Sequence, residues 1–313
     1  MNTRKTLGFV VKLLITLLLV GFLAWITPIR ETFDLIRHSD LNWMLLAFLG
    51  LVVCNWVQAK RWQLLLDRPD VRLSQLLHIQ MVGTTAGFFL PSAVAGDIVR
   101  SGMLARDKAL LERSIISTLL GRLMGLGALF MLGLLGAFLW PNPALRFQPN
   151  QIALYLAGSA ALGLAPGWLL WKRLRRNRDW WLSGAAWKKR IYEGFTYLES
   201  LRNPALLANC FLLSLMLQGA TMFSGWCLFR AVQADLPIAA AFALMPLTQL
   251  GSLAPLSLGG VGVREGITMA LFHGLVGIPR AQCLATSALA YVNGFAISLP
   301  GVFLILLTRR KKS

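Results

Sequence analysis

Acidic residues are scarce in this chain of 313 residues, which holds only 13 Asp and Glu. Charged residues of both signs make up 14% of the sequence, whereas 56% of it is hydrophobic. A soluble domain of this length needs more charge to cover its surface. Several apolar runs instead reach the roughly 20 residues that cross a bilayer core as a helix. The composition therefore excludes an ordinary soluble protein and predicts an all-α integral membrane protein.

Histidine and cysteine are equally few. The three histidines (His38, His78 and His273) and the four cysteines are scattered through the chain, and no two cysteines have CxxC spacing. Isolated cysteines in apolar stretches are typical of small buried hydrophobes. The sequence also lacks a Walker motif, which argues against ATP hydrolysis by this chain. We expect no catalytic residue, no metal site and no cofactor.

Positive charge is abundant, with 31 Lys and Arg and a net charge of +18. These residues flank the apolar runs, where membrane orientation and anionic lipid head groups account for them, so we expect no nucleic-acid partner. Six spans with the N-terminus inside place 24 of the 31 on the cytoplasmic side. This bias predicts a multi-pass protein of a bacterial plasma (inner) membrane with cytoplasmic N- and C-termini. The predicted spans are 7–27, 41–59, 115–140, 151–171, 204–230 and 282–308.

Two further apolar stretches, 74–105 and 237–278, are interrupted by Gly and Pro. Cytoplasmic charge flanks the first on both sides, and both ends of the second lie outside. Each is predicted to be a re-entrant hairpin, entering from opposite faces, where protein or water meets the opened backbone. Residues 41–140 and 204–308 then form two halves of opposite orientation, an inverted-topology repeat typical of secondary transporters. The rest of this single membrane domain (1–313) is a first span and loop (1–40), a span with a basic amphipathic cytoplasmic loop (141–203) and a basic tail (309–313).

The two broken stretches share a motif. Residues 91–102 read "PSAVAGDIVRSG" and residues 255–266 read "PLSLGGVGVREG". A shift of 164 positions superposes Gly87, Pro91, Gly96, Val99, Arg100 and Gly102 on Gly251, Pro255, Gly260, Val263, Arg264 and Gly266. We predict that Pro91, Pro255, Gly87 and Gly251 form the hairpin turns, because proline removes a backbone donor and glycine permits tight turns.

A helix that begins after such a turn presents free N–H groups, and the planar fork of arginine matches phosphate oxygens. Arg122 adds a third arginine inside an apolar span, where an ionisable group is by default functional. We therefore predict a lipid-phosphate site at Arg100, Arg264, Arg122, Gly96 and Gly260.

Carboxylates beside these arginines leave other interpretations open. Arg100 could pair with Glu265, and Arg264 with Asp97, to lock the two hairpins together. Asp97 and Glu265 could equally serve as gate or proton-coupling groups, and Arg122 could pair with Asp97 or a backbone carbonyl. A set of amides and hydroxyls could line a polar path or join helices: Asn55, Gln58, Thr84, Thr85, Gln218, Thr248, Gln249 and Asn293.

The segments "GFFLPSAVAGDIVRSGML", "RWQLLL" and "PLSLGGVGVREG" resemble the lysylphosphatidylglycerol synthase transmembrane (flippase-like) family over roughly residues 10–308. The resemblance implies a flippase-like membrane region. Because the chain ends at "TRRKKS", we expect a stand-alone member without the C-terminal aminoacyl-transferase domain.

The predicted function is a lipid flippase that moves a phosphate-bearing lipid between leaflets. The lipid would be a phospholipid, an aminoacyl-phospholipid or a polyprenyl-phosphate-linked lipid. One alternative is a polytopic glycosyl- or head-group transferase, although acidic residues are few. Another is a non-transporting scaffold that recruits a partner lipid-synthesis enzyme.

Overall fold

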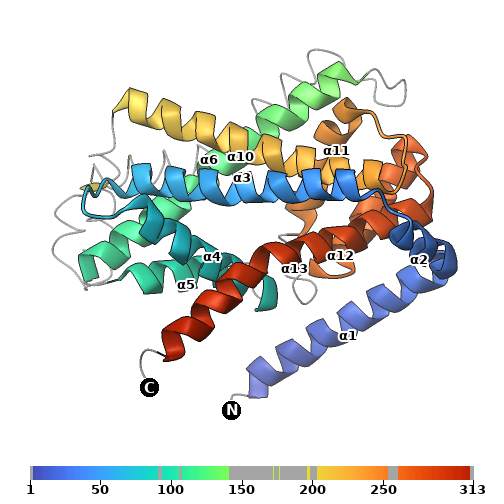
Figure 1. Ribbon diagram of the computed structural model, residues 1–313, viewed down its shortest axis with the longest axis horizontal. Coiled ribbons are helices and arrows are strands. Elements are labelled where there is room, and N and C mark those ends of the chain that lie inside the picture. The colour runs from blue at the N-terminus through green and yellow to red at the C-terminus, as the bar shows by residue number, and fades with distance from the viewer. Residues whose placement is uncertain are drawn as a thin grey trace.

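The computed structural model describes residues 3–90, 94–105, 108–140, 172, 176, 196–197, 203–252 and 260–310. All regular secondary structure in this part of the chain is helical (Figure 1). Four predicted features fall outside the described residues: the span 151–171, nearly all of the basic loop, the turn prolines Pro91 and Pro255, and the tail 311–313.

The helices follow the predicted order in each half. An N-terminal pair, α1 (Thr3–Ile26) and α2 (Ile29–Arg37), precedes the first half. That half contains α3 (Leu41–Leu66), α4 (Leu73–Phe89), α5 (Ala95–Leu104) and α6 (Lys108–Leu139). The second half contains α10 (Pro204–Ala231), α11 (Ile238–Ser252), α12 (Val263–Thr268), the π-helix η2 (Met269–Val276) and α13 (Arg280–Arg310).

Helices α3 and α10 form the centre of the molecule and begin in the same way. The side chain of Asp40 caps α3 by accepting from the N–H of Asn42 at 2.8 Å, and Asn203 caps α10 by accepting from the N–H of Ala205 at 3.0 Å. Such caps satisfy donors that the first helical turn leaves free. Side-chain hydrogen bonds join Ser224 to the carbonyl of Ala47 and Arg61 to Ser214, so the two helices run antiparallel.

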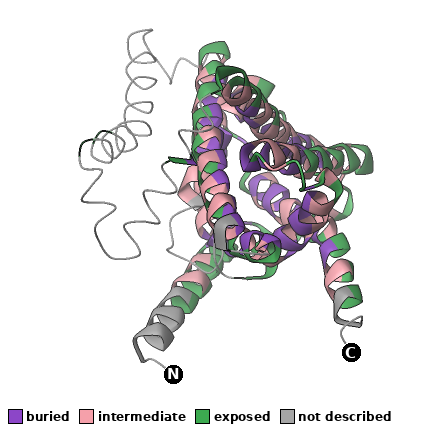
Figure 2. Cartoon of the chain, turned by 90° about the vertical axis from the view of Figure 1, so that its left-hand side faces the viewer, coloured by how far each residue is buried: buried purple, intermediate pink, exposed green. Residues whose placement is uncertain are grey.

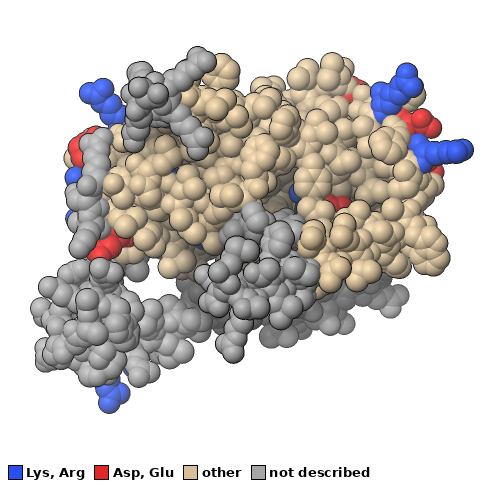
Figure 3. Space-filling model, turned by 90° about the horizontal axis from the view of Figure 1, so that it is seen from below, with Lys and Arg blue, Asp and Glu red and all other residues tan. Residues whose placement is uncertain are grey.

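Four helices in the described part of the chain are long and apolar enough to cross a membrane, namely α3, α6, α10 and α13. Helices α1 and α2 form a fifth candidate only if they are taken together, because they are bent by 88°. The candidate helices expose many leucines and phenylalanines, as expected of lipid-facing surfaces. In Figure 3 the visible charged side chains gather mostly at the two ends of the long axis. These findings establish a multi-pass helical membrane protein; the count of six spans stays a prediction.

Both predicted broken stretches are helix pairs. Helix α4 packs on α5, and α11 packs on α12. The first pair lies toward one end of the long axis and the second toward the other (Figure 1). The breaks fall between Phe89 and Ala95 and between Ser252 and Val263, at the two copies of the Gly/Pro motif.

The last helix of each half packs on the first arm of the other half's hairpin. Helix α6 packs on α11, where Gly136 lies close to Ala243 and Gly133 lies close to Pro246. Helix α13 packs on α4 in the same antiparallel manner, and Thr85 donates a 2.7 Å hydrogen bond to the carbonyl of Ser298. The two halves are therefore interlocked through small residues.

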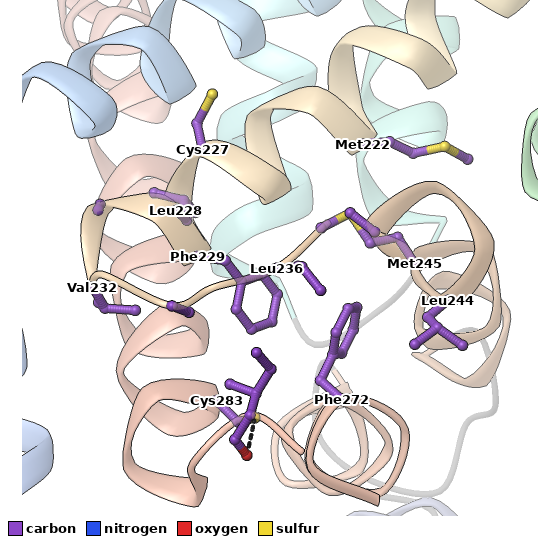
Figure 4. Packing of buried hydrophobic residues seen from close by; sticks show 14 of the residues in the cluster. Met222, Cys227, Leu228, Phe229, Val232, Leu236, Leu244, Met245, Phe272 and Cys283 are labelled. Carbon is purple, nitrogen blue, oxygen red and sulfur yellow. Dashed lines mark hydrogen bonds between the residues drawn. The ribbon is translucent and has the colours of Figure 1, made fainter. Parts of the chain in front are cut away.

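Two hydrophobic clusters stabilise the two ends of the bundle. The larger one joins α10, α11 and η2 and includes the ring pair Phe229–Phe272, whose centroids are 4.6 Å apart (Figure 4). The smaller one joins α3, α4 and α5 through residues such as Trp62, Ile79 and Leu104. Figure 2 shows the buried residues facing inward among the helices and the exposed ones outward. Each hairpin is thus fixed at its own end of the molecule.

Replacement of Gly136 by Ala should destabilise the fold. A Cβ at this position would lie 2.6 Å from the backbone nitrogen of Ala243, and backbone atoms cannot move aside cheaply. Overpacking of this kind costs about 1–3 kcal/mol, so we expect a lower Tm in detergent. Gly21→Ala is the matched control, since nothing lies within 4 Å of its new Cβ. Equal melting temperatures for the two variants would contradict the close packing of α6 on α11.

Candidate functional site

A cavity of about 120 Å³ lies between α3, α5 and α6 and is lined by both charged side chains that are buried in the described part of the first half, Arg61 and Arg100. Arg61, Arg100 and Arg122 line it together with a single carboxylate, Asp97. Its other lining residues are Gln58, Trp62, Leu65, Ser117, Thr118 and Gly121. A cavity of this size with polar walls can hold several water molecules or a small anionic group.

Arg100, predicted as a phosphate ligand, is 7% exposed and forms one wall of the cavity. Its guanidinium pairs with Asp97 one turn earlier in α5 and donates to the amide oxygen of Gln80 on α4. The central carbon of the guanidinium lies 5.8 Å from the ring centroid of Trp62, within the range of a cation–π contact. The Nε–H of Arg100 is buried and has no hydrogen-bond acceptor among the described residues. Arg100 is therefore held in place with one donor left for a ligand.

Arg61 was not predicted to belong to the site. It is 7% exposed, and its Nη1 donates a 2.8 Å hydrogen bond to the hydroxyl of Ser214 on α10. Gly121 of α6 makes room for it, since a Cβ there would lie 3.3 Å from the Nη2 of Arg61. One feature of the sequence could have identified it: Arg61 is a charged residue within an apolar run that continues to Leu66.

Arg122 and Asp97 complete the charged cluster. Arg122 pairs with the second carboxylate oxygen of Asp97, so this one carboxylate bridges two arginines. The alternative pairing of Arg122 with Asp97 is thus confirmed. The side chain of Arg122 is 41% exposed, in contrast to the other two arginines. It is consequently the member of the cluster that an incoming ligand meets most readily.

The alternative in which Arg100 pairs with Glu265 and Arg264 with Asp97, locking the two hairpins together, is wrong. Arg100 pairs with Asp97 and Arg264 pairs with Glu265, so each arginine uses the carboxylate of its own motif copy. The reason is local: in each copy the acid lies within one helical turn of the arginine, whereas the two hairpins lie toward opposite ends of the bundle.

A polar chain leads from the cavity along α4 and α3. Thr84 donates to the side-chain oxygen of Asn55 at 2.8 Å, and the amide of Gln80 lies between this pair and Arg100. Gln58 lines the cavity itself. Three other members of the predicted path instead join neighbouring helices through backbone carbonyls: Thr85, Gln218 and Asn293. Thr248 bonds within its own helix.

The second copy of the motif is built differently. Arg264 stacks on Tyr291, with 4.1 Å from its guanidinium carbon to the ring centroid, and its side chain is 33% exposed. Glu265 accepts a 2.6 Å hydrogen bond from the N–H of Gly262 and so caps its own short helix. This carboxylate takes up a donor that was expected to be free for an anion. Gly260 and Gly262 have φ of 79° and 85°, which explains glycine at these turn positions.

Glycines also set the geometry of the first copy. A Cβ on Gly96 would lie 2.6 Å from the carbonyl oxygen of Gly83, so the two arms of the hairpin cross at van der Waals distance. Gly87 lies beside Gly96 in the same crossing. This close approach places the start of α5 against α4 and directs Arg100 toward Gln80.

Gly83→Ala should displace Arg100 while leaving the fold intact. The new Cβ would press on the methylene carbons of Arg100, which belong to a flexible side chain. It would also lie 3.1 Å from the carbonyl oxygen of Gly96, a contact that a shift of a few tenths of an ångström relieves. A charge-assisted hydrogen bond is worth about 1.5–3 kcal/mol, so we expect affinity for a phosphate monoester to fall at least about tenfold by titration calorimetry. The control is Gly102→Ala, whose Cβ meets nothing within 4 Å. Unchanged affinity in both variants would show that Arg100 does not contact the anion.

Tyr291→Leu should loosen Arg264, because it removes the aromatic face on which the guanidinium stacks. A cation–π contact is worth about 0.5–2 kcal/mol, so the Tm should fall measurably. Tyr291→Phe keeps the ring and should have a smaller effect. Equal losses in the two variants would indicate that the hydroxyl, and not the ring, holds this region.

The family model described as the lysylphosphatidylglycerol synthase TM region matches residues 9–301. The matched range includes both copies of the motif and every residue that lines the cavity. A comparison with curated proteins found no match for the chain.

Proposed function

The chain belongs to the lysylphosphatidylglycerol synthase transmembrane family, and on that premise we propose that it moves a phosphate-bearing lipid between the leaflets of a bacterial inner membrane. The family associates the chain with lipid-related flippase or synthase function. Transport, rather than chemistry on the head group, is the function that the site supports best. The lipid is a phospholipid, an aminoacyl-phospholipid or a polyprenyl-phosphate-linked lipid.

One observation carries this proposal: the cavity gathers three arginines from α3, α5 and α6 inside an apolar helix bundle. Arginine presents several N–H donors in a planar fork that fits phosphate oxygens. Charged groups at membrane depth are costly and are retained where they serve a substrate path. A lipid phosphate bound here would leave its acyl chains in the surrounding bilayer.

The arrangement of the two halves supports alternating access. Helices α3 and α10 occupy equivalent places in the two halves and run antiparallel, as an inverted repeat requires. The packing of α6 on α11 is repeated by that of α13 on α4. The ends of α5 at Leu104 and of α12 at Thr268 are separated by the same 164 residues as the motif copies. In this proposal α4–α5 and α11–α12 are re-entrant hairpins that open toward opposite leaflets.

Asp97 acts as the gate in this mechanism. With no lipid bound, its carboxylate pairs with both Arg100 and Arg122. An incoming phosphate competes for the same donors, frees Asp97 and leaves the hairpin able to move against α6. Glu265 holds Arg264 in the second copy and is the corresponding gate there. In this proposal the α4–α5 end and both termini face the cytoplasm, and the basic residues Lys60, Arg68 and Arg72 near that end support this orientation.

A leaflet-exchange assay in proteoliposomes tests the proposal. Fluorescent phosphatidylglycerol, phosphatidylethanolamine and a polyprenyl phosphate would be compared for the native protein and for Arg61→Ala, Arg100→Ala and Arg264→Ala. We expect exchange of at least one lipid and its loss, by at least about tenfold, in all three variants.

Arg37→Ala is the control, because Arg37 is an exposed arginine at the end of α2, remote from the cavity. Native Tm values for the variants would exclude unfolding as the cause. Exchange that survives in the Arg61 and Arg100 variants would contradict a phosphate site at the cavity. No exchange of any lipid by the native protein would contradict transport itself.

A further inference from the structure

The charges that line the cavity do not balance. Arg61, Arg100 and Arg122 contribute three positive charges, and Asp97 is the single carboxylate among the lining residues, which all lie in the described part of the chain. Arginine stays protonated in proteins, so its charge is not lost on burial. The lining therefore carries a net charge of two positive units.

The neutral partners of these arginines satisfy hydrogen bonds without neutralising charge. Arg61 donates to the hydroxyl of Ser214, and Arg100 donates to the amide oxygen of Gln80. Both arginines are 7% exposed, so water screens them poorly. Asp97 gives Arg100 a counter-charge that it shares with Arg122, whereas Arg61 has no carboxylate partner among the described residues. Buried charge without a counter-charge is strongly unfavourable in a medium of low dielectric constant. The Nε–H of Arg100 is buried without an acceptor among the described residues, so it is a donor that an anion could satisfy.

We propose that this cavity selects head groups whose phosphate carries two negative charges, namely a phosphomonoester or a diphosphate, over phosphodiesters that carry one. This inference rests on the proposed function, because it assumes that the cavity is the lipid-phosphate site. It narrows the three lipid classes named above to those with a terminal phosphate or a diphosphate. Phosphatidylglycerol and its aminoacyl derivatives, which are phosphodiesters, are the disfavoured class.

The number of unesterified phosphate oxygens also favours a phosphomonoester over a phosphodiester. A phosphomonoester presents three terminal oxygens, whereas a phosphodiester presents two that are not esterified. Three arginine forks arranged around one cavity match three terminal oxygens better than two. The second ionisation of a phosphomonoester has a pKa near 6, so the dianion predominates at neutral pH.

Affinity for two lipids with identical acyl chains tests the selection directly. Phosphatidic acid and phosphatidylglycerol would be titrated into the purified full-length protein at pH 7.5 and their binding measured by native mass spectrometry. We expect phosphatidic acid to bind at least about tenfold more tightly, because it adds a charge-assisted contact in a buried site. In Arg61→Gln, which lowers the net charge of the lining to one, this ratio should shrink to about threefold or less. Arg37→Gln is the matched control and should keep the native ratio.

The pH dependence keeps the inference testable if Arg61→Gln fails to fold. Between pH 8 and pH 5 the phosphomonoester loses its second charge, so the ratio of the two affinities in the native protein should fall toward one. The ionisable groups that face the bound phosphate are Arg61, Arg100, Arg122 and Asp97. The arginines keep their charge over this range. Loss of the charge on Asp97 would raise the net positive charge of the lining and favour the dianion, so it could not produce the expected fall in the ratio.

Inorganic phosphate and glycerol phosphate distinguish a lipid from a soluble ligand. Competition of either with phosphatidic acid supports recognition of the phosphate itself. Binding of the soluble anions with no binding of phosphatidic acid would assign the site to a soluble dianion and contradict lipid transport. Equal affinities for the two lipids at pH 7.5, with exchange intact and dependent on Arg100, would overturn the charge selection and leave the proposed function standing. If the protein neither binds nor exchanges any of these lipids, both the charge selection and the proposed function are contradicted.

Discussion

The fold of the first half depends on keeping three guanidinium groups charged beside one carboxylate inside an apolar bundle. Without partners, buried arginines would cost several kcal/mol each. The chain surrounds them with neutral acceptors from three different helices: Ser214 on α10, Gln80 on α4 and, through Gln80, the pair of Asn55 and Thr84. The cluster is therefore stable and still carries a net positive charge, so it can bind an anion.

The hairpins are what bring these groups together. An unbroken helix could not place Asp97 and Arg100 against α4, because the chain must reverse between Phe89 and Ala95. Gly83 and Gly96 allow the two arms to cross so closely that α5 begins against the backbone of α4. Packing of α13 on α4 then holds the hairpin from its other side, through Thr85 and the carbonyl of Ser298. Helix α6 packs on α11 in the same manner, so each half holds the hairpin of the other.

The sequence predicted those parts of the architecture that depend on residues close together in the chain. Glycine and proline marked both helix breaks, and the repeated arginines marked two positions whose surroundings proved to be polar. The grouping of Arg61 with Arg100 was not predictable in this way, because the two residues meet only through the packing of α3 and α5 on α4 and α6. The pairing of each arginine with its own neighbouring carboxylate was missed because the two copies were treated as facing one another. The difference between the copies depends on Tyr291, which lies outside the motif, and on capping by Glu265, whose place in the first copy is taken by Ser101.

A cryo-electron microscopy map of the protein in nanodiscs that contain phosphatidic acid would test the central claim most directly. The account predicts density for a phosphate between Arg61, Arg100 and Arg122, with the carboxylate of Asp97 moved away from at least one of its two arginines. An empty cavity in a well-resolved map, with Asp97 still bridging Arg100 and Arg122 and the lipid phosphate bound elsewhere, would contradict it.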